Sequence, residues 1–251
     1  MITKKFGWIP DIPDQRDFKY SAPKKSAKKR LYRVDLRPYM PPIYEQGYLG
    51  SCVSQAVGAC LQFLQMKQKR SWFVPSRLFL YYNARLIDGT TNYDAGSYIR
   101  SGIKAANRYG GPEETLWKYN INNFKIKPPI NVYTEGLTHQ ALKYERVAQN
   151  AIQIETRISQ GYPIILGIAV YESFLSNKVA KSGYVKLPGK REVMVGGHAI
   201  VLVGYNQTQR RFICRNSWGS GWGLGGNFTI PYEYILNNNL TEDLWTIQLV
   251  E

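Results

Sequence analysis

The spacing of apolar residues changes near the middle of the chain, and the two spacings predict two kinds of structure. After a loop-like stretch broken by prolines, apolar positions recur every three or four residues, at Val53, Ala56, Val57, Cys60, Leu61 and Leu64. This period predicts a helix from about Ser51–Cys52 to about Lys69. The same period over residues 76–87 and 97–109 predicts two further helices.

Short apolar runs replace this pattern in the second half of the chain. After a predicted helix at 148–160, the runs are rich in β-branched and aromatic residues and are separated by turn residues. Such runs are typical of an antiparallel sheet or barrel. We expect the strands at residues 162–170, 182–187, 198–206, 210–218 and 226–231. Helices followed by strands indicate an α+β protein with two lobes.

Residues 1–33 differ in composition from the rest of the chain, and we call them the N-terminal arm. The arm holds ten Lys and Arg against three Asp, so it carries +7 of the net charge of +15. Its run PKKSAKKR at 23–30 predicts an exposed basic segment. This segment is a solvated tail or linker, a docking site for an acidic partner or nucleic acid, or a regulatory element. The rest of the chain carries +8, which weakens a nucleic-acid-binding role for the protein as a whole.

The sequence also indicates the cellular compartment and whether a metal site is expected. No apolar run reaches the length of a membrane span, and residues 1–18 hold no continuous apolar stretch of the kind found in signal peptides. Three cysteines without such a leader argue against a disulfide framework. We therefore expect an intracellular protein, in the cytoplasm or, for a viral source, packaged in a virion. With two histidines and no C-x-x-C spacing, we expect no metal site and no cofactor.

Cys52 and His198 are the residues best placed for nucleophilic chemistry. Cys52 begins the first predicted helix, where the helix dipole and unpaired N–H groups favour the thiolate. His198 opens an apolar strand after Gly196-Gly197, whereas His139 lies in a polar stretch and is expected at the surface. From position alone, an unrelated cysteine and histidine remain the alternative.

Three blocks around these residues resemble the papain-like cysteine peptidases. The blocks are EQGYLGSCVSQAVGA (45–59), GGHAIVLVGY (196–205) and RNSWGSGWGLGGNFTI (215–230), and they follow the order of that family. Cys52 and His198 lie 146 positions apart, within the usual range of the family.

The resemblance implies a papain-like, two-lobe α+β fold with the active-site cleft between the lobes. It covers residues 34–251 as one peptidase domain, in which about 34–125 form a mainly helical lobe and about 126–251 a mainly β, barrel-like lobe. The implied function is that of a cysteine endopeptidase acting on protein or peptide substrates. Endopeptidase action is favoured because neither histidine lies in the first-lobe loop where carboxydipeptidases of the family carry a histidine pair.

Four catalytic residues are implied by the resemblance. Cys52 would be the nucleophile that forms an acyl-enzyme, and His198 its acid and base. Asn216 would orient the imidazole, and Gln46 would donate to the oxyanion. Because all four are present, an active enzyme is favoured over a catalytically silent peptide-binding module. A ligase or transglutaminase that uses the same acyl-enzyme stays open.

Substrate contacts are implied at further positions, namely Gly96, Ser97, Tyr98, Gly197, Trp218 and Trp222. Trp218 would cover the hydrogen bond between Asn216 and His198, and Trp222 would line the primed side of the cleft. The glycines before the histidine imply a P2 pocket without bulk or charge on that wall. An apolar or aromatic P2 side chain is therefore expected.

The chain departs from the family pattern at three positions. Leu49 stands where a disulfide cysteine is common, and Val53 where a large aromatic residue is common. Ser97 replaces the second glycine of the paired-glycine wall, which places a side chain at one substrate-backbone contact. The missing cysteine fits a reducing compartment.

The arm is shorter than the usual inhibitory propeptide of the family. Its apolar residues, Phe6, Trp8, Ile9, Ile12 and Phe18, are too many for a free tail. We expect a short pro-segment that lies along the cleft, with a structural strap packed elsewhere as the alternative.

Overall fold

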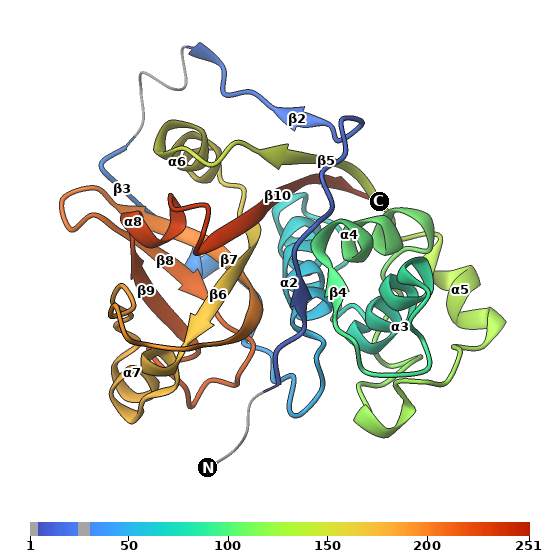
Figure 1. Cartoon of the computed structure of the whole chain (residues 1–251). Coiled ribbons are helices and arrows are strands. Elements are labelled where there is room, and N and C mark those ends of the chain that lie inside the picture. The colour runs from blue at the N-terminus through green and yellow to red at the C-terminus, as the bar shows by residue number, and fades with distance from the viewer. Residues whose placement is uncertain (1–4, 25–30) are drawn as a thin grey trace.

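The three helices predicted in the first half of the chain lie in one lobe of the molecule, on the right in Figure 1. The computed structural model describes residues 5–24 and 31–251. The helices of this lobe are α2 (Cys52–Lys67), α3 (Arg77–Asp88), α4 (Ile99–Arg108) and α5 (Ile130–Gly136), with the short 3₁₀ segment η2 (Ile121–Asn123). The first three confirm the helices expected from the apolar period.

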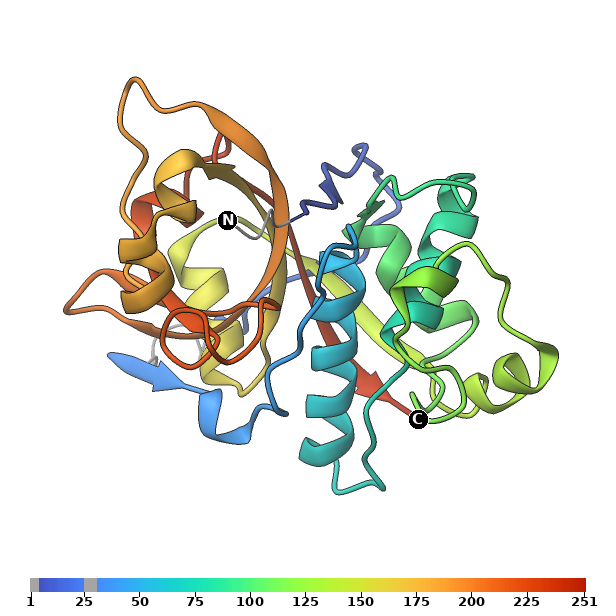
Figure 2. The same cartoon turned by 90° about the horizontal axis from the view of Figure 1, so that it is seen from below.

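Helix α2 lies between the two lobes. Figure 2 shows it with the sheet on one side and the remaining helices on the other. All its residues from Cys52 to Gln65 are buried, although the sequence pattern indicated a single apolar face. Its buried polar side chains form hydrogen bonds inside the protein. For example, the Tyr44 hydroxyl donates to Gln62 Oε1 at 2.5 Å. A helix enclosed in this way holds its first residue, Cys52, at a fixed place between the lobes.

The other lobe is built on a curved sheet with strands in the order β2-β5-β10-β6-β7-β8-β9 and with β3 beside β7. The strands are β2 (Lys19–Tyr20), β3 (Arg33–Asp35), β5 (Ala141–Val147), β6 (Ile164–Tyr171), β7 (Met194–Asn206), β8 (Arg211–Arg215), β9 (Asn227–Pro231) and β10 (Thr241–Val250). Neighbours are antiparallel except β2 and β5. Within the described residues the sheet is open, so it does not close into a barrel.

Short helices connect these strands. They are α6 (Ala151–Ser159), α7 (Asn177–Ser182) and α8 (Tyr232–Ile235), with the 3₁₀ segments η1 (Arg37–Tyr39) and η3 (Glu172–Leu175). Helix α6 confirms the helix expected at 148–160. The strands β6, β7, β8 and β9 confirm four of the five strands that the sequence predicted.

The strand expected at residues 182–187 is wrong. Helix α7 occupies the preceding residues, and Gly183, with φ of +60°, closes its last turn. Tyr184 then pairs with the sheet through a single bridge to Thr229. A glycine in the left-handed region provides a helix end where the apolar alternation had indicated an extended chain.

Strands β5 and β10 were not expected, because both mix polar and apolar residues. β10 also carries a bulge, since its register with β6 shifts between Glu242 and Trp245. Asp243, inside this bulge, has φ of +59°, a left-handed conformation that Asp tolerates better than most residues. Bulges re-aim side chains, and here Asp243 is buried, with 4% of its surface exposed.

The described part of the arm crosses from one lobe to the other. β1 (Trp8–Ile9) pairs in parallel with β4 (Ser97–Tyr98) of the helical lobe, and β2 pairs in parallel with β5 of the sheet. Figure 1 shows this dark-blue segment running between the helices and the sheet. Residues 25–30 of the basic run lie outside the described residues.

The departures from the family pattern have local explanations. Leu49 is buried against Leu78 and Tyr81, so apolar packing stands where family members often carry a disulfide. Val53 lies against Gly102, where an added Cβ would come within 2.6 Å of the valine Cγ1. A large ring at position 53 would not fit beside α4. All three cysteines are free thiols and are buried.

Candidate active site

Cys52 and His198 come together where α2 meets β7. The backbone N–H of Ala199, the residue after His198, donates to the Cys52 sulfur at 3.4 Å. Both Cys52 and His198 are fully buried. His139 lies apart and is half-buried, with its Nε2 3.0 Å from Glu135. The structure therefore brings His198, and not His139, to the cysteine.

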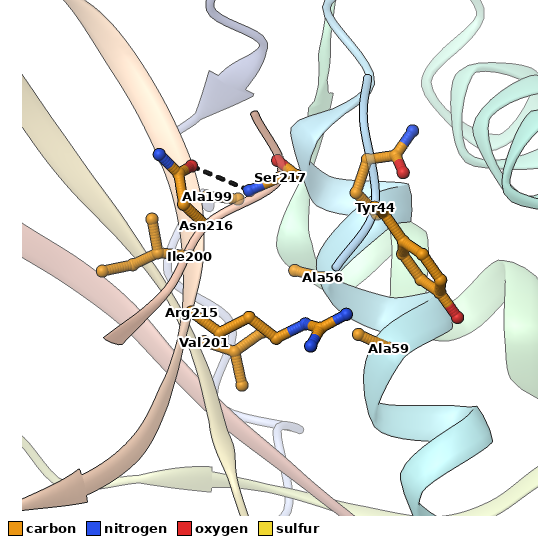
Figure 3. A pocket seen from close by; sticks show the side chains of 10 residues that line it. Tyr44, Ala56, Ala59, Ala199, Ile200, Val201, Arg215, Asn216 and Ser217 are labelled. Carbon is orange, nitrogen blue, oxygen red and sulfur yellow. Dashed lines mark hydrogen bonds between the residues drawn. The ribbon is translucent and has the colours of Figure 1, made fainter. Parts of the chain in front are cut away.

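Asn216 reaches the histidine from the end of the neighbouring strand. β8 pairs with β7, the strand that carries His198, with Arg215 opposite Val201, and ends there, so Asn216 is the first residue of the loop that follows β8. The Asn216 Oδ1 and His198 Nε2 atoms are 2.8 Å apart. The same oxygen accepts from the backbone N–H of Ser217 at 2.8 Å, which fixes the amide (Figure 3). Because Asn216 occupies the Nε2 side of the imidazole, Nδ1 is the nitrogen available for proton exchange with the Cys52 sulfur.

The two tryptophans of the glycine-rich block pack behind this hydrogen bond. The Trp218 ring lies over His198 with centroids 4.8 Å apart and planes tilted by 31°. Trp222 stands perpendicular to Trp218 at 5.1 Å and stacks on Phe174 at 5.6 Å. Rings packed in this way exclude water, which would otherwise compete for the Asn216–His198 bond. Trp222 is largely buried in this aromatic cluster.

Gln46 is positioned by Ser217, which the sequence reasoning did not single out. The Ser217 hydroxyl donates to Gln46 Oε1 at 2.7 Å, and the Gln46 backbone N–H donates to Ser217 O at 2.9 Å. With its oxygen held by Ser217, the amide turns Nε2 the other way, where it donates to Leu49 O at 3.0 Å. The only sequence signal for Ser217 was its place between Asn216 and Trp218.

Arg215 ties the strand that carries Asn216 to the loop that carries Gln46. Its buried guanidinium donates to Pro41 O at 2.6 Å and also to the carbonyl of Pro42. Figure 3 shows Arg215 and Tyr44 facing a small cavity of about 10 Å³ between α2 and β7. That space suffices for about one water. These hydrogen bonds hold the segment that carries Asn216 against the loop that leads to Gln46.

The arm lies directly over these residues. Gln46 Nε2 donates to the backbone carbonyl of Lys5 at 3.1 Å, and Ser97 N donates to the carbonyl of Gly7 at 2.8 Å. The Phe6 ring meets His198 edge-on, with centroids 6.3 Å apart. Residues expected to bind the backbone of a substrate therefore hold the backbone of the arm.

Glycines make this close approach sterically feasible. An added Cβ at Gly7 would lie 1.8 Å from Gly50 O, and one at Gly96 would lie 2.2 Å from Gly7 O. Ser97 keeps its backbone hydrogen bond to the Gly7 carbonyl, and the residue is fully buried. Tyr98, half-buried, pairs with Ile9 in the same short ladder.

Trp8 occupies a pocket on the sheet side of the arm. Its indole lies on Gly167 and Gly197, where added Cβ atoms would come within 1.9 Å and 2.8 Å of the ring. Its Nε1 donates to Asp243 Oδ2 at 3.1 Å. Gly197 was expected in the P2 pocket, whereas neither Gly167 nor Asp243 was singled out from the sequence. We call this space the Trp8 pocket.

Beyond Trp8, the arm is held by an ionic cluster that we call the Arg146 cluster. Arg146 contacts Asp11 at 2.8 Å, Asp17 at 3.1 Å and Asp243 at 3.2 Å. Arg100 adds a contact to Asp17 at 2.6 Å. Asp11 and Asp17 belong to the arm, so both arginines bind the arm to the rest of the protein.

The covered site holds Cys52 as a thiol. Burial raises the pKa of the Cys52 thiol to about 11, against hydrogen bonds from the backbone N–H groups of Ala199, Gly7 and Val53. The helix position had been expected to favour the thiolate. With the arm in place, exclusion of water outweighs the helix dipole, so the neutral thiol predominates at pH 7.

Comparisons with known proteins agree with this geometry. The family model described as "Papain family cysteine protease" matches residues 32–242. An uncharacterised peptidase C1-like protein of Acanthamoeba polyphaga mimivirus is 38% identical, with 99% of this chain and 88% of that protein covered. The crystal structure of xylellain, a cysteine protease from Xylella fastidiosa, matches with a TM-score of 0.93 and 37% identity, over 98% of this chain and 96% of the other.

More distant structures share the fold. The procathepsin B S9 of Trypanosoma congolense matches with a TM-score of 0.77 at 14% identity, over 98% of this chain and 86% of that one. In the described part of the chain, every helix is too short or too polar to cross a membrane.

Proposed function

The chain belongs to the papain family of cysteine proteases, and we propose that Cys52, His198, Asn216 and Gln46 carry out its reaction. It is a cysteine-type peptidase that acts on protein or peptide substrates. The observation that carries the assignment is the hydrogen bond from Gln46 to the carbonyl of Lys5, because it supports Gln46 as a donor to a peptide carbonyl in the cleft.

In the proposed reaction, His198 takes the proton of the Cys52 thiol, and the sulfur attacks the carbonyl carbon of the scissile bond. The oxyanion accepts hydrogen bonds from Gln46 Nε2 and from the Cys52 backbone N–H at the start of α2. Loss of one such donor typically costs about 3–4 kcal/mol in the transition state. His198 protonates the leaving amine, which leaves a thioester on Cys52. His198 then deprotonates a water, which hydrolyses the thioester and restores the thiol.

Asn216 and Trp218 act on the histidine in this proposal. Asn216 Oδ1 holds the Nε2 side of the ring at 2.8 Å, so the other nitrogen serves the sulfur. Trp218 packs on the imidazole and keeps water from that bond. The half-buried Tyr98 and the backbone of Ser97 are proposed to bind the substrate backbone, since both now pair with the arm.

We further propose that the arm inhibits the enzyme by lying in its cleft. The arm binds the Gln46 amide and the Ser97 N–H, which a substrate would need. It presents the Gly7 N–H to the sulfur, and not a carbonyl carbon, so it is placed to resist cleavage. In this proposal, the arm (residues 1–33) inhibits a peptidase domain at residues 34–251. The burial of Cys52 under the arm supports it.

A single methyl group tests both proposals in the full chain. Gly7→Ala places a Cβ against the Gly50 backbone, which cannot yield, so the arm must leave the cleft. Gly189→Ala is the control, because Gly189 lies in an exposed loop where an added Cβ would meet only the Glu192 side chain. Intact-mass analysis after an epoxysuccinyl peptide inhibitor should show labelling of the Gly7→Ala chain and little labelling of the wild type or the control.

Three outcomes separate the claims. Labelling that disappears when Cys52→Ala is combined with Gly7→Ala supports Cys52 as the nucleophile. Equal labelling of wild type and Gly7→Ala contradicts inhibition by the arm. No labelling of any form contradicts the catalytic assignment and favours a silent peptide-binding module.

Two further proposals concern the type of cleavage and the compartment. Endopeptidase action is favoured because His139 sits on the helical lobe in contact with Glu135, away from Cys52. A reducing, intracellular compartment, either cytoplasm or virion, fits three buried free thiols and a relative encoded by a giant virus. Three free thiols in the protein isolated without reductant would support this, whereas a disulfide in the isolated native protein would contradict it.

The excess positive charge of the arm supports one additional proposal, docking to an acidic partner or nucleic acid. Ten Lys and Arg lie in residues 1–33. Affinity for a nucleic acid should fall steeply with salt and should be reduced when the lysines of the 23–30 run are replaced by Gln. Affinity that is independent of those lysines would contradict it.

A further inference from the structure

The Trp8 pocket is shaped for a flat aromatic side chain. It spans three neighbouring strands, with Gly167 in β6, Gly197 in β7 and Asp243 in β10. Added Cβ atoms at the two glycines would penetrate the indole of Trp8. Glycine inside a strand weakens the sheet unless another group approaches the backbone closely. Two glycines on adjacent strands, both under one ring, therefore indicate a surface made to receive a ring.

A carboxylate stands at the edge of this aromatic surface. Asp243 Oδ2 accepts from Trp8 Nε1 at 3.1 Å and from the Asp11 N–H at 2.7 Å. The β10 bulge and the left-handed backbone of Asp243 aim the side chain here. Strained conformations of this kind concentrate at functional sites. Both donors to Oδ2 belong to the arm, so both depart when the arm leaves.

We propose that Asp243 makes the released enzyme selective for substrates with an indole side chain, tryptophan, at P2. The inference rests on the proposed function, in which the arm occupies the substrate cleft, and on Gly197 lying in the P2 pocket. The indole would take the place of Trp8, stacking on Gly167 and Gly197 and donating its N–H to Asp243. This changes the expectation from the sequence, which indicated an apolar or aromatic P2 side chain without a polar requirement.

The charges around Asp243 favour a neutral donor over a cation. Arg146 donates to Asp243 Oδ1 from two nitrogens, each at 3.2 Å, and stays when the arm leaves. Arg100 also stays, whereas the carboxylates of Asp11 and Asp17 depart with the arm. Glu242, the residue before Asp243 on β10, is exposed to solvent, where it lines a surface cavity together with Arg146 and Asp243. The emptied pocket thus keeps one carboxylate beside two guanidinium groups, which disfavours Arg or Lys at P2.

The test uses the full chain carrying Gly7→Ala together with Trp8→Ala, because the Arg146 cluster still holds the arm in Gly7→Ala alone and Trp8→Ala frees the pocket. The substrates are four peptides that differ only at P2. The P2 residues are Trp, 3-benzothienylalanine, Phe and Arg. Benzothienylalanine replaces the indole N–H by sulfur and keeps its shape, so it isolates the hydrogen bond. Sites that bond a substrate N–H reject analogues lacking it. We expect kcat/KM for Trp to exceed that for benzothienylalanine by about tenfold or more, with Arg the poorest.

Asp243→Asn in the same background gives the residue-specific test. Asn tolerates the left-handed backbone at this position. Arg146 would keep the amide oxygen on its own side, so the NH₂ group would face the pocket and meet the indole N–H as a second donor. The ratio of Trp to benzothienylalanine should fall to about one. Gly167→Ala, which fills the pocket floor, should lower kcat/KM for all three aromatic peptides together.

The outcomes distinguish this inference from the function on which it rests. If the chain carrying Gly7→Ala and Trp8→Ala neither labels nor cleaves any peptide, the proposed function fails. If it cleaves all four peptides without preference for Trp, or prefers Arg, the selectivity for indole is wrong. A Trp preference that persists in Asp243→Asn shows that Asp243 is not its source. If Asp243→Asn does not fold, the comparison of Trp with benzothienylalanine in the chain carrying only Gly7→Ala and Trp8→Ala decides the point.

Discussion

The arm is held at two regions whose physical chemistry differs. Over Cys52, residues 5–8 fit by backbone hydrogen bonds and by gaps that only glycine allows. At the Arg146 cluster, Asp11 and Asp17 are held by ionic hydrogen bonds to arginines of the protein. The first region depends on shape and the second on charge. Blocking the active site and retaining the arm are therefore separable, and single substitutions should separate them.

The largest expected effect comes from removing the fit over Cys52. In the covered form, burial raises the pKa of the Cys52 thiol to about 11, so about one thiol in 10⁴ is ionised at pH 7. Activated cysteines have pKa values of about 3.5–7.5. We expect Gly7→Ala to raise the rate of alkylation of Cys52 by iodoacetamide at pH 7 by at least about 100-fold.

The pH profile identifies the cause of this increase. In the wild type the alkylation rate should keep rising above pH 8, because the thiol still titrates there. In the Gly7→Ala chain it should level off near or below neutral pH. A wild-type profile that levels off at neutral pH would show that Cys52 is already ionised under the arm. The stated reason for the large effect of Gly7→Ala would then be wrong.

The next effect in size comes from Arg146→Ala, which breaks the charged region alone. Removing one partner of a buried ion pair typically costs about 3–5 kcal/mol. Part of that free energy is lost from docking of the arm. Without Arg146, Asp11 and Asp17 are more stable in water, and they reach water only when the arm leaves. We expect epoxysuccinyl labelling of Cys52 to rise by about 10–100-fold, and trypsin to cut the arm faster.

Arg16→Ala is the matched control for this substitution. Arg16 pairs with Asp14 at 2.8 Å, lies in the same arm and is largely exposed. Exposed pairs contribute little, so its labelling rate should stay at the wild-type value. If Arg146→Ala also leaves labelling unchanged, the ionic cluster does not retain the arm, and shape alone accounts for the covered site.

A smaller effect is expected from pH, through Asp11. Burial, and then repulsion from the Asp243 carboxylate, raise the pKa of the Asp11 carboxyl to about 6, against hydrogen bonds from Trp245 and Arg100. A pKa that is higher in the docked arm than in the free arm means that docking takes up a proton. The stabilisation from protonation is present at low pH and is lost as pH rises toward 6.

Release of the arm should therefore increase between about pH 4 and pH 6 and stay constant above. Labelling of the wild type, divided by that of the Gly7→Ala chain at each pH, removes the intrinsic titration of the thiol. We expect this ratio to rise several-fold over the interval, and Asp11→Asn to flatten it. A ratio that falls with rising pH would mean that the Arg146 cluster prefers the ionised Asp11, contrary to the direction stated here.

The sequence located the residues that we propose as catalytic more readily than it located the contacts of the arm. Cys52, His198 and Asn216 each stand in a local block whose residue types and order are distinctive, so they could be named before the fold was known. The helices could also be predicted from the sequence, because the 3.6-residue period of apolar positions is a local property. The false strand at 182–187 shows the limit, since Gly183 ended a helix that the alternation did not reveal.

The contacts that control the site depend on long-range packing. Trp8 and Asp243 are 235 positions apart, and their hydrogen bond exists only because β10 bulges beside β6. Neither the bulge nor the strand was visible in the polar and apolar pattern of residues 241–250. The apolar residues of the arm did predict that it would pack somewhere, but no local feature paired Asp11 or Asp17 with Arg146.

The smallest expected effect tests whether charge matters in the region over Cys52. Lys5 Nζ lies 2.5 Å from Asp94, but the Lys5 side chain is 48% exposed. Such a pair contributes about 0–1 kcal/mol. Lys5→Ala also keeps the backbone carbonyl that Gln46 binds, and Asp94 keeps its bonds to Gly50 N. Labelling of Cys52 should therefore change by less than about threefold at low salt and not at all at high salt. An increase as large as that of Arg146→Ala would mean that charge retains the arm at both ends, and that the region over Cys52 does not hold by shape alone.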